Sequence, residues 1–195
     1  MDHIVHVKNK ISRGIGIIRK AKYFLNKKCL CNLYYSFVYP YLMYCVEVWG
    51  NAADSHLHPL NILQNNIIRT ITFSYYIYRA NTNKLYVDLG ILPLHKLVTQ
   101  RIAIMMFKYA NNMLPKVMNE LYLRRNSDVH SHNTRRSEHL HIPNGTHTKN
   151  FVYRSVLIWN ELVHIKVETN LTLTKFKKIL KLYLLHNELK IGYTS

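Results

Sequence analysis

Hydrophobic residues recur at three- and four-residue steps along most of this chain, the spacing that places them on one face of an α-helix. The first stripe comprises Ile4, Val7, Ile11, Ile15 and Ile18. A second runs from His58 to Thr72 through Leu60, Leu63, Ile67 and Ile71. The last follows Thr172, a good N-cap residue, and reaches His186 through Phe176, Ile179, Leu180, Tyr183 and Leu184. The pattern predicts a mainly α-helical protein.

Residues 29–46 are apolar and contain no Lys or Arg. Their length just reaches that of a membrane-spanning helix. Five Tyr, two further polar residues and the central Pro40 argue against a span. Because proline lacks the amide that a helix interior needs, we expect a kink or a break at Pro40 between two shorter buried helices, and no membrane association.

Glycine and proline divide the middle of the chain. Gly90 is placed to end a short helix over residues 81–89, and a longer helix is expected over residues 92–110. Residues 115–122 add a turn of helix at most.

One polar stretch, residues 123–150, is rich in Arg and His and is longer than ordinary loops. We therefore predict a helical domain over residues 1–122, a long basic loop over residues 123–150 and a small helical region over residues 151–195.

The charge is strongly unbalanced, with 27 Lys and Arg against 10 Asp and Glu and a net charge of +17. Such a surface attracts polyanions and releases their counterions, so RNA or DNA is the expected partner, bound through its phosphate backbone. Lysines also line the free side of the last predicted helix. The candidate nucleic-acid-binding residues are Lys8, Lys10, Arg13, Arg19, Lys20, Lys27, Lys28, Arg135, Arg136 and Lys149.

No catalytic or metal site is expected. The acids are scattered along the sequence, with no adjacent pair. A two-metal phosphoryl-transfer site needs carboxylates close enough to hold two metal ions. Cys29 and Cys31 are two residues apart and would project to different sides of a helix, so they do not suit one metal ion. Gly14 and Gly16 fall within a helical pattern rather than after a strand, so they do not form a phosphate-binding loop. We predict no cofactor.

Three cysteines in apolar sequence predict buried, reduced thiols rather than disulfides, with Cys45 packed in the core. The first ten residues lack the apolar segment of a signal peptide. We therefore expect an intracellular protein, nuclear or cytoplasmic.

The motifs HIVHVKNKISRGIGIIRKAKYFLNKKCLCNLYYSFVYPYLMYCVEVWGN, ILQNNIIRTIT, LGILPLHKL, HNTRRSEHLHIP, VLIWNEL and FKKILKLYLL occur in this order. As an ordered set they resemble the region that follows the palm in reverse transcriptases of jockey-type non-LTR (LINE-like) retrotransposons. The resemblance spans about residues 3 to 185, and each motif alone is weak.

The resemblance implies a thumb and post-thumb fragment of an RNA-directed DNA polymerase, encoded by a transposable element. Its thumb helices, residues 3 to about 72, would lie against the template and primer duplex. No Phe-Ala-Asp-Asp or Tyr-x-Asp-Asp string of a palm occurs, so the chain is expected not to be an enzyme by itself.

Two alternatives stay open. One is a helical interaction module that docks a partner, such as a palm supplied in trans, through exposed apolar surface. The other is a non-functional relic of the element. The aromatic residues expected on the docking surface are Trp49, Tyr75, Tyr76 and Trp159.

Overall fold

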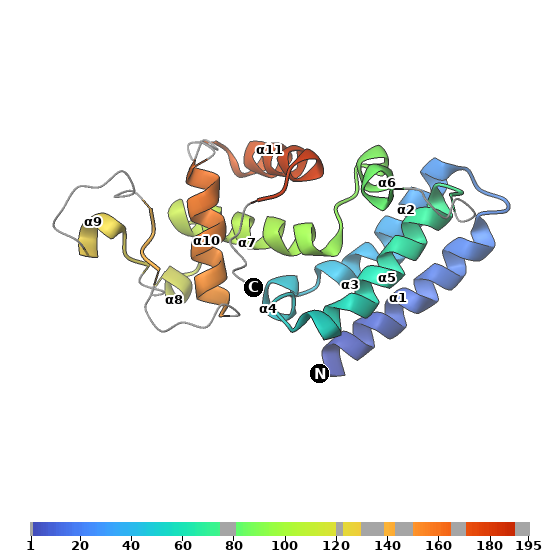
Figure 1. Ribbon diagram of the computed structural model, residues 1–195, viewed down its shortest axis with the longest axis horizontal. Coiled ribbons are helices and arrows are strands. Elements are labelled where there is room, and N and C mark those ends of the chain that lie inside the picture. The colour runs from blue at the N-terminus through green and yellow to red at the C-terminus, as the bar shows by residue number, and fades with distance from the viewer. Residues whose placement is uncertain are drawn as a thin grey trace. The chain divides into compact units, whose positions relative to one another are not determined.

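The computed structural model describes residues 2–74, 81–119, 123–129, 139–142, 150–164 and 171–189. Over these ranges the protein is mainly α-helical, as the hydrophobic pattern predicts, and its β pairing is limited to one isolated bridge (Figure 1). The helices are α1 (Asp2–Ala21), α2 (Lys27–Phe37), α3 (Tyr39–Met43), α4 (Val46–Trp49), α5 (Asp54–Ile71), α6 (Thr82–Leu89), α7 (Leu94–Ala110), α8 (Lys116–Asn119), α9 (Asn126–Val129), α10 (Phe151–His164) and α11 (Leu173–His186).

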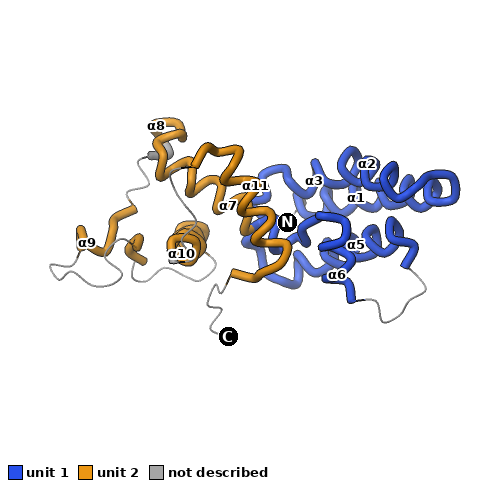
Figure 2. The backbone as a smooth tube through the Cα atoms, turned by 90° about the horizontal axis from the view of Figure 1, so that it is seen from above, with its two compact units in different colours: residues 1–98 blue, residues 99–195 orange. Residues whose placement is uncertain are grey.

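The chain divides into two compact units, residues 1–98 and residues 99–195 (Figure 2). The boundary falls inside α7, which starts in unit 1 and ends in unit 2. The domain boundaries expected from the sequence rest on composition, a different criterion from packing, and they stay a prediction.

Helix α1 turns its apolar stripe into the core of unit 1, where it packs along α5 and α2. The first predicted stripe is thereby confirmed, although Ile4 at its start is only partly buried. The buried members of the stripe, each 4 % exposed or less, are Val7, Ile11, Ile15 and Ile18.

The helix is interrupted at Val38, two residues before Pro40, so the predicted break between two shorter helices is confirmed. Helix α2 ends at Phe37 and α3 begins at Tyr39, with Val38 between them. Pro40 then lies in the first turn of α3, where a missing amide removes no helical hydrogen bond. The apolar stretch is thus a pair of short helices, and its inner residues Leu30, Tyr34, Val38 and Leu42 are fully buried.

Helix α5 is longer than the sequence predicts, since it begins at Asp54 rather than at His58. An acidic residue in the first turn complements the positive end of the helix dipole, which favours this earlier start. Pro59 is accommodated inside the helix. The predicted stripe is confirmed at its buried members Leu60, Ile67 and Ile71, whereas Leu63 is partly exposed.

Helix α6 ends where the sequence predicts, at Gly90. This glycine has φ +62, a left-handed conformation that costs glycine little because it has no Cβ. The next helix, α7, begins at Leu94, two positions later than predicted. Gln64 of α5 bonds to the start of α7, where its side-chain oxygen accepts from the Leu94 amide at 2.8 Å.

Unit 2 has its own core. Phe107 of α7 stacks on Phe176 of α11, with ring centroids 4.2 Å apart. The predicted start of α11 is confirmed, because the Thr172 hydroxyl accepts from the Lys175 amide as an N-cap. Ile179 was expected on the apolar face but is 43 % exposed. The buried positions of α11 are Phe176, Leu180 and Leu184.

Parts of the polar stretch 123–150 are described, and they carry some structure. Arg125 and Leu140 form the isolated bridge, and α9 follows Arg125 directly. The Asn160 side chain of α10 donates to the Leu140 carbonyl and accepts from its amide, at 2.9 and 2.8 Å. These two bonds tie Leu140, within the stretch, to α10.

Candidate nucleic-acid interface

The basic residues predicted on the first helix lie outside its buried stripe. Lys8, Arg13, Arg19 and Lys20 are exposed, and Lys10 is partly exposed. All five therefore keep contact with solvent, where phosphates would meet them.

They do not form a single face of α1. Arg13 and Lys20 are seven residues apart and so project within about 20° of each other on the outer side. Lys8 lies beside α5 and lines a pocket with His56 and Pro59. Lys10 lies on the other flank, with its ammonium 5.9 Å from the centre of the Tyr41 ring.

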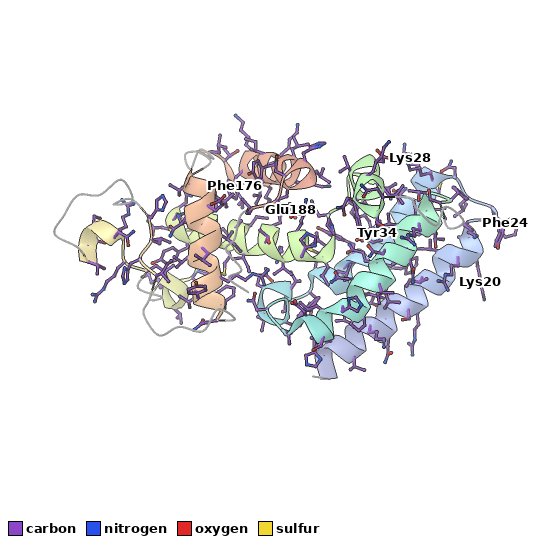
Figure 3. The ribbon with its side chains drawn as sticks, viewed as in Figure 1. Lys20, Phe24, Lys28, Tyr34, Phe176 and Glu188 are labelled. Carbon is purple, nitrogen blue, oxygen red and sulfur yellow. The ribbon has the colours of Figure 1, made fainter. Side chains whose placement is uncertain are left out.

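A denser group of cations lies where α1 ends and α2 begins. We call residues 19–28 the α1–α2 corner. Figure 3 shows Lys20 on α1, Phe24 in the connecting turn and Lys28 on α2, all at this end of the helix pair. The basic residues of the corner are Arg19, Lys20, Lys22, Lys27 and Lys28.

Lys22 was not among the predicted site residues. It follows the last residue of α1 and is partly exposed. The sequence could have indicated this residue, because it lies between the basic end of one predicted helix and further basic residues that follow it.

The turn in the corner is held by backbone hydrogen bonds. The amides of Phe24 and Leu25 both donate to the Ala21 carbonyl, at 3.0 and 2.9 Å. Asn26 caps α2, with its side-chain oxygen accepting from the Cys29 amide at 3.0 Å. The corner is therefore a formed turn, and its side chains are displayed on a fixed backbone.

The electrostatics of the corner favour an anion. Arg19 and Lys20 lie in the last turn of α1, where cations complement the helix dipole. Lys27 and Lys28 lie in the first turn of α2, which has no acidic residue, so their charges add to the positive end of that dipole. No Asp or Glu occurs between Asp2 and Glu47 in the sequence, so none lies within the corner itself.

The remaining predicted site residues fall elsewhere. Arg135, Arg136 and Lys149 lie outside the described residues. In unit 2 a second basic surface follows the outer side of α11, where the exposed lysines are Lys175, Lys177 and Lys178.

The prediction that Trp49 and Trp159 lie on an exposed docking surface is wrong. Trp49 is 8 % exposed and donates its indole N–H to the Tyr44 carbonyl at 2.7 Å. Trp159 is 7 % exposed. Each ring is large and apolar enough to be drawn into the core of its own unit. Tyr75 and Tyr76 lie outside the described residues.

The cysteines are free, but the prediction that they are buried is wrong. Cys45 is exposed, at φ +49 between α3 and α4, and Cys29 and Cys31 are half-buried. Burial raises the pKa of the Cys31 thiol, and nearby Lys27 opposes that shift. The turn after α3 faces solvent, so an apolar sequence context did not bury Cys45.

Neither a metal cluster nor a membrane span occurs within the described ranges. In those ranges no three His, Cys, Asp or Glu side chains come together as metal ligands would. In the same ranges no helix combines the length and the apolar character needed to cross a membrane.

No protein-family model, curated protein or solved structure matches this chain. The resemblance to reverse transcriptases therefore stays a prediction from the ordered motifs. The α1–α2 corner, by contrast, stands on the charges and exposure of its own residues.

Proposed function

We propose that this chain is a non-catalytic part of a non-LTR retrotransposon reverse transcriptase that binds nucleic acid through the phosphate backbone. The motif order supports the first part. The α1–α2 corner supports the second, and the observation that carries it is five cations within residues 19–28 with no acid among them.

Phosphate contacts explain this arrangement better than base reading does. Lysine is a flexible point charge, and four of the five cations in the corner are lysines. Phosphates are alike in every sequence, so contacts of this kind give affinity and position without base specificity. Binding is therefore expected to RNA and DNA alike. We also propose that this binding takes place within the cell.

The salt dependence of binding tests this proposal. The full chain is titrated into fluorescently labelled single-stranded, duplex and RNA–DNA hybrid oligonucleotides, and anisotropy is followed from about 50 to 200 mM salt. We expect tight binding at low salt and a linear fall of log affinity with log salt. Each phosphate that the protein neutralises contributes a slope of about −0.7 to −0.9.

A matched pair of variants locates the phosphate-binding surface. Lys20→Gln with Lys28→Gln removes two charges from the corner, and the slope should become shallower by about one unit for each phosphate that is no longer neutralised. Lys84→Gln with Lys116→Gln removes two exposed charges elsewhere and should change the slope less. Absence of binding at low salt, or equal effects of the two pairs, would contradict the proposal.

A further inference from the structure

The α1–α2 corner displays two aromatic rings to solvent. Tyr23 is 76 % exposed and Phe24 is 87 % exposed, the highest values for aromatic side chains among the described residues. Figure 3 shows Phe24 at the outer edge of the turn. Ordinary folding buries such rings, since each carries a large apolar area.

The fold does not use these rings. The turn is closed by the backbone bonds to the Ala21 carbonyl, which any side chains at positions 23 and 24 would allow. The Lys22 ammonium lies 5.1 Å from the centre of the Tyr23 ring, so the neighbour of that ring is itself a cation of the corner. Both rings keep most of their surface available to a ligand.

The ligand must combine negative charge with flat apolar groups, because the corner interleaves cations with aromatic rings. Single-stranded nucleic acid has this chemistry: its phosphates match the lysines, and its unpaired bases stack on exposed rings. In a duplex the base faces are already stacked on one another, so only the phosphates are offered. We propose that Tyr23 and Phe24 stack the bases of single-stranded RNA or DNA whose phosphates contact the basic residues of the corner.

This inference rests on the proposed nucleic-acid binding and adds a preference for unpaired strands. An anionic bilayer is the competing occupant. The corner fits it less well, because its apolar segment is only three residues long, between Lys22 and Asn26. Membrane binding through an apolar surface grows with the apolar area buried, and this area is small.

The first test compares an ordinary single-stranded oligonucleotide with an abasic one of the same length and charge. The full-length wild-type chain should prefer the strand that carries bases. The variant Tyr23→Ala with Phe24→Ala should lose at least about tenfold in affinity for that strand and should bind both strands alike. Its affinity for a blunt duplex should stay unchanged.

Tyr44→Ala is the matched control. Tyr44 is 66 % exposed and contacts His3 near the start of α1, at the opposite end of the helix from the corner. This variant should bind single strands as the wild type does. Thermal unfolding of both variants should match the wild type, because the replaced rings are exposed.

Phe24→Leu and Phe24→Trp separate stacking from apolar burial. Leucine keeps apolar area without a flat ring, so it should weaken single-strand binding, whereas tryptophan should preserve it. If both variants bind single strands equally well, stacking is overturned. If the alanine pair loses binding to anionic vesicles but keeps its single-strand affinity, the corner is a membrane site and the inference fails.

The proposed function and the stacking inference fail in different ways. Absence of wild-type binding to any nucleic acid at low salt would overturn both. Wild-type binding that ignores the presence of bases would overturn the stacking inference alone.

Discussion

At the residue scale, Gln64 joins three parts of unit 1. Its amide nitrogen donates to the Tyr34 hydroxyl at 3.1 Å and to the Leu92 carbonyl at 3.0 Å. Its oxygen accepts from the Leu94 amide, one of the helix-start amides of α7 that have no partner within the helix. Burial raises the pKa of the Tyr34 phenol, so this hydroxyl stays protonated in the network.

We predict that Gln64→Leu lowers the free energy of unfolding by about 2 to 4 kcal/mol, because it leaves buried polar groups without partners. Urea unfolding followed by circular dichroism measures the change. Asn32→Leu on the exposed side of α2 is the control and should change stability by no more than about 0.5 kcal/mol. Equal effects of the two substitutions would show that the network contributes nothing.

The hydrophobic periodicity did not predict that Gln64 is buried. It lies on the same stripe as Leu60 and Ile67 and is 1 % exposed, yet a glutamine is normally expected at the surface. Its partners are 28 and 30 residues away in the sequence, and a local pattern carries no information about them. Cys45 shows the converse, because its neighbours in the sequence are apolar and yet its side chain is exposed.

At the element scale, the two glycines of α1 have different surroundings. A Cβ on Gly14 would lie 3.0 Å from the Phe37 carbonyl oxygen and 3.0 Å from a methyl of Val38. A Cβ on Gly16 would meet nothing within 4 Å. The sequence is compatible with flexibility or close packing at both positions, and close packing applies to Gly14 alone.

We predict opposite effects of alanine at these two sites. Gly16→Ala should raise the free energy of unfolding by about 0.5 to 1 kcal/mol, because glycine is a poor helix former. Gly14→Ala gains the same helix propensity but forces α1 away from the backbone of α2, at a cost of about 1 to 3 kcal/mol, so it should destabilise. Thermal unfolding of the two single variants compares them directly. A stabilised Gly14→Ala protein would contradict this packing.

At the scale of the whole molecule, a net charge of +17 acts on both folding and binding. Like charges repel in the compact state, and salt screens them over a Debye length that falls from about 30 Å at 0.01 M to about 10 Å at 0.1 M. The same screening weakens attraction to phosphates. Salt should therefore move stability and nucleic-acid affinity in opposite directions.

We predict that the unfolding temperature of the free chain rises as NaCl increases from about 0.01 to 0.1 M. Lys177→Glu with Lys178→Glu, on the exposed side of α11, should raise the midpoint at low salt and reduce its response to salt. Lys177→Arg with Lys178→Arg keeps the charge and should behave as the wild type. A midpoint that does not change with salt would show that repulsion is not destabilising.

Residue type and local pattern were enough to predict the helical class, the break near Pro40, the Gly90 cap and the surplus of positive charge. These features depend on near neighbours along the chain or on composition, so periodicity and residue type suffice to read them. Packing sets which side chains share a surface. It placed Lys8 beside His56 of α5, buried Trp49 and left Phe24 in solvent. Such outcomes depend on partners distant in sequence, whose positions only packing sets.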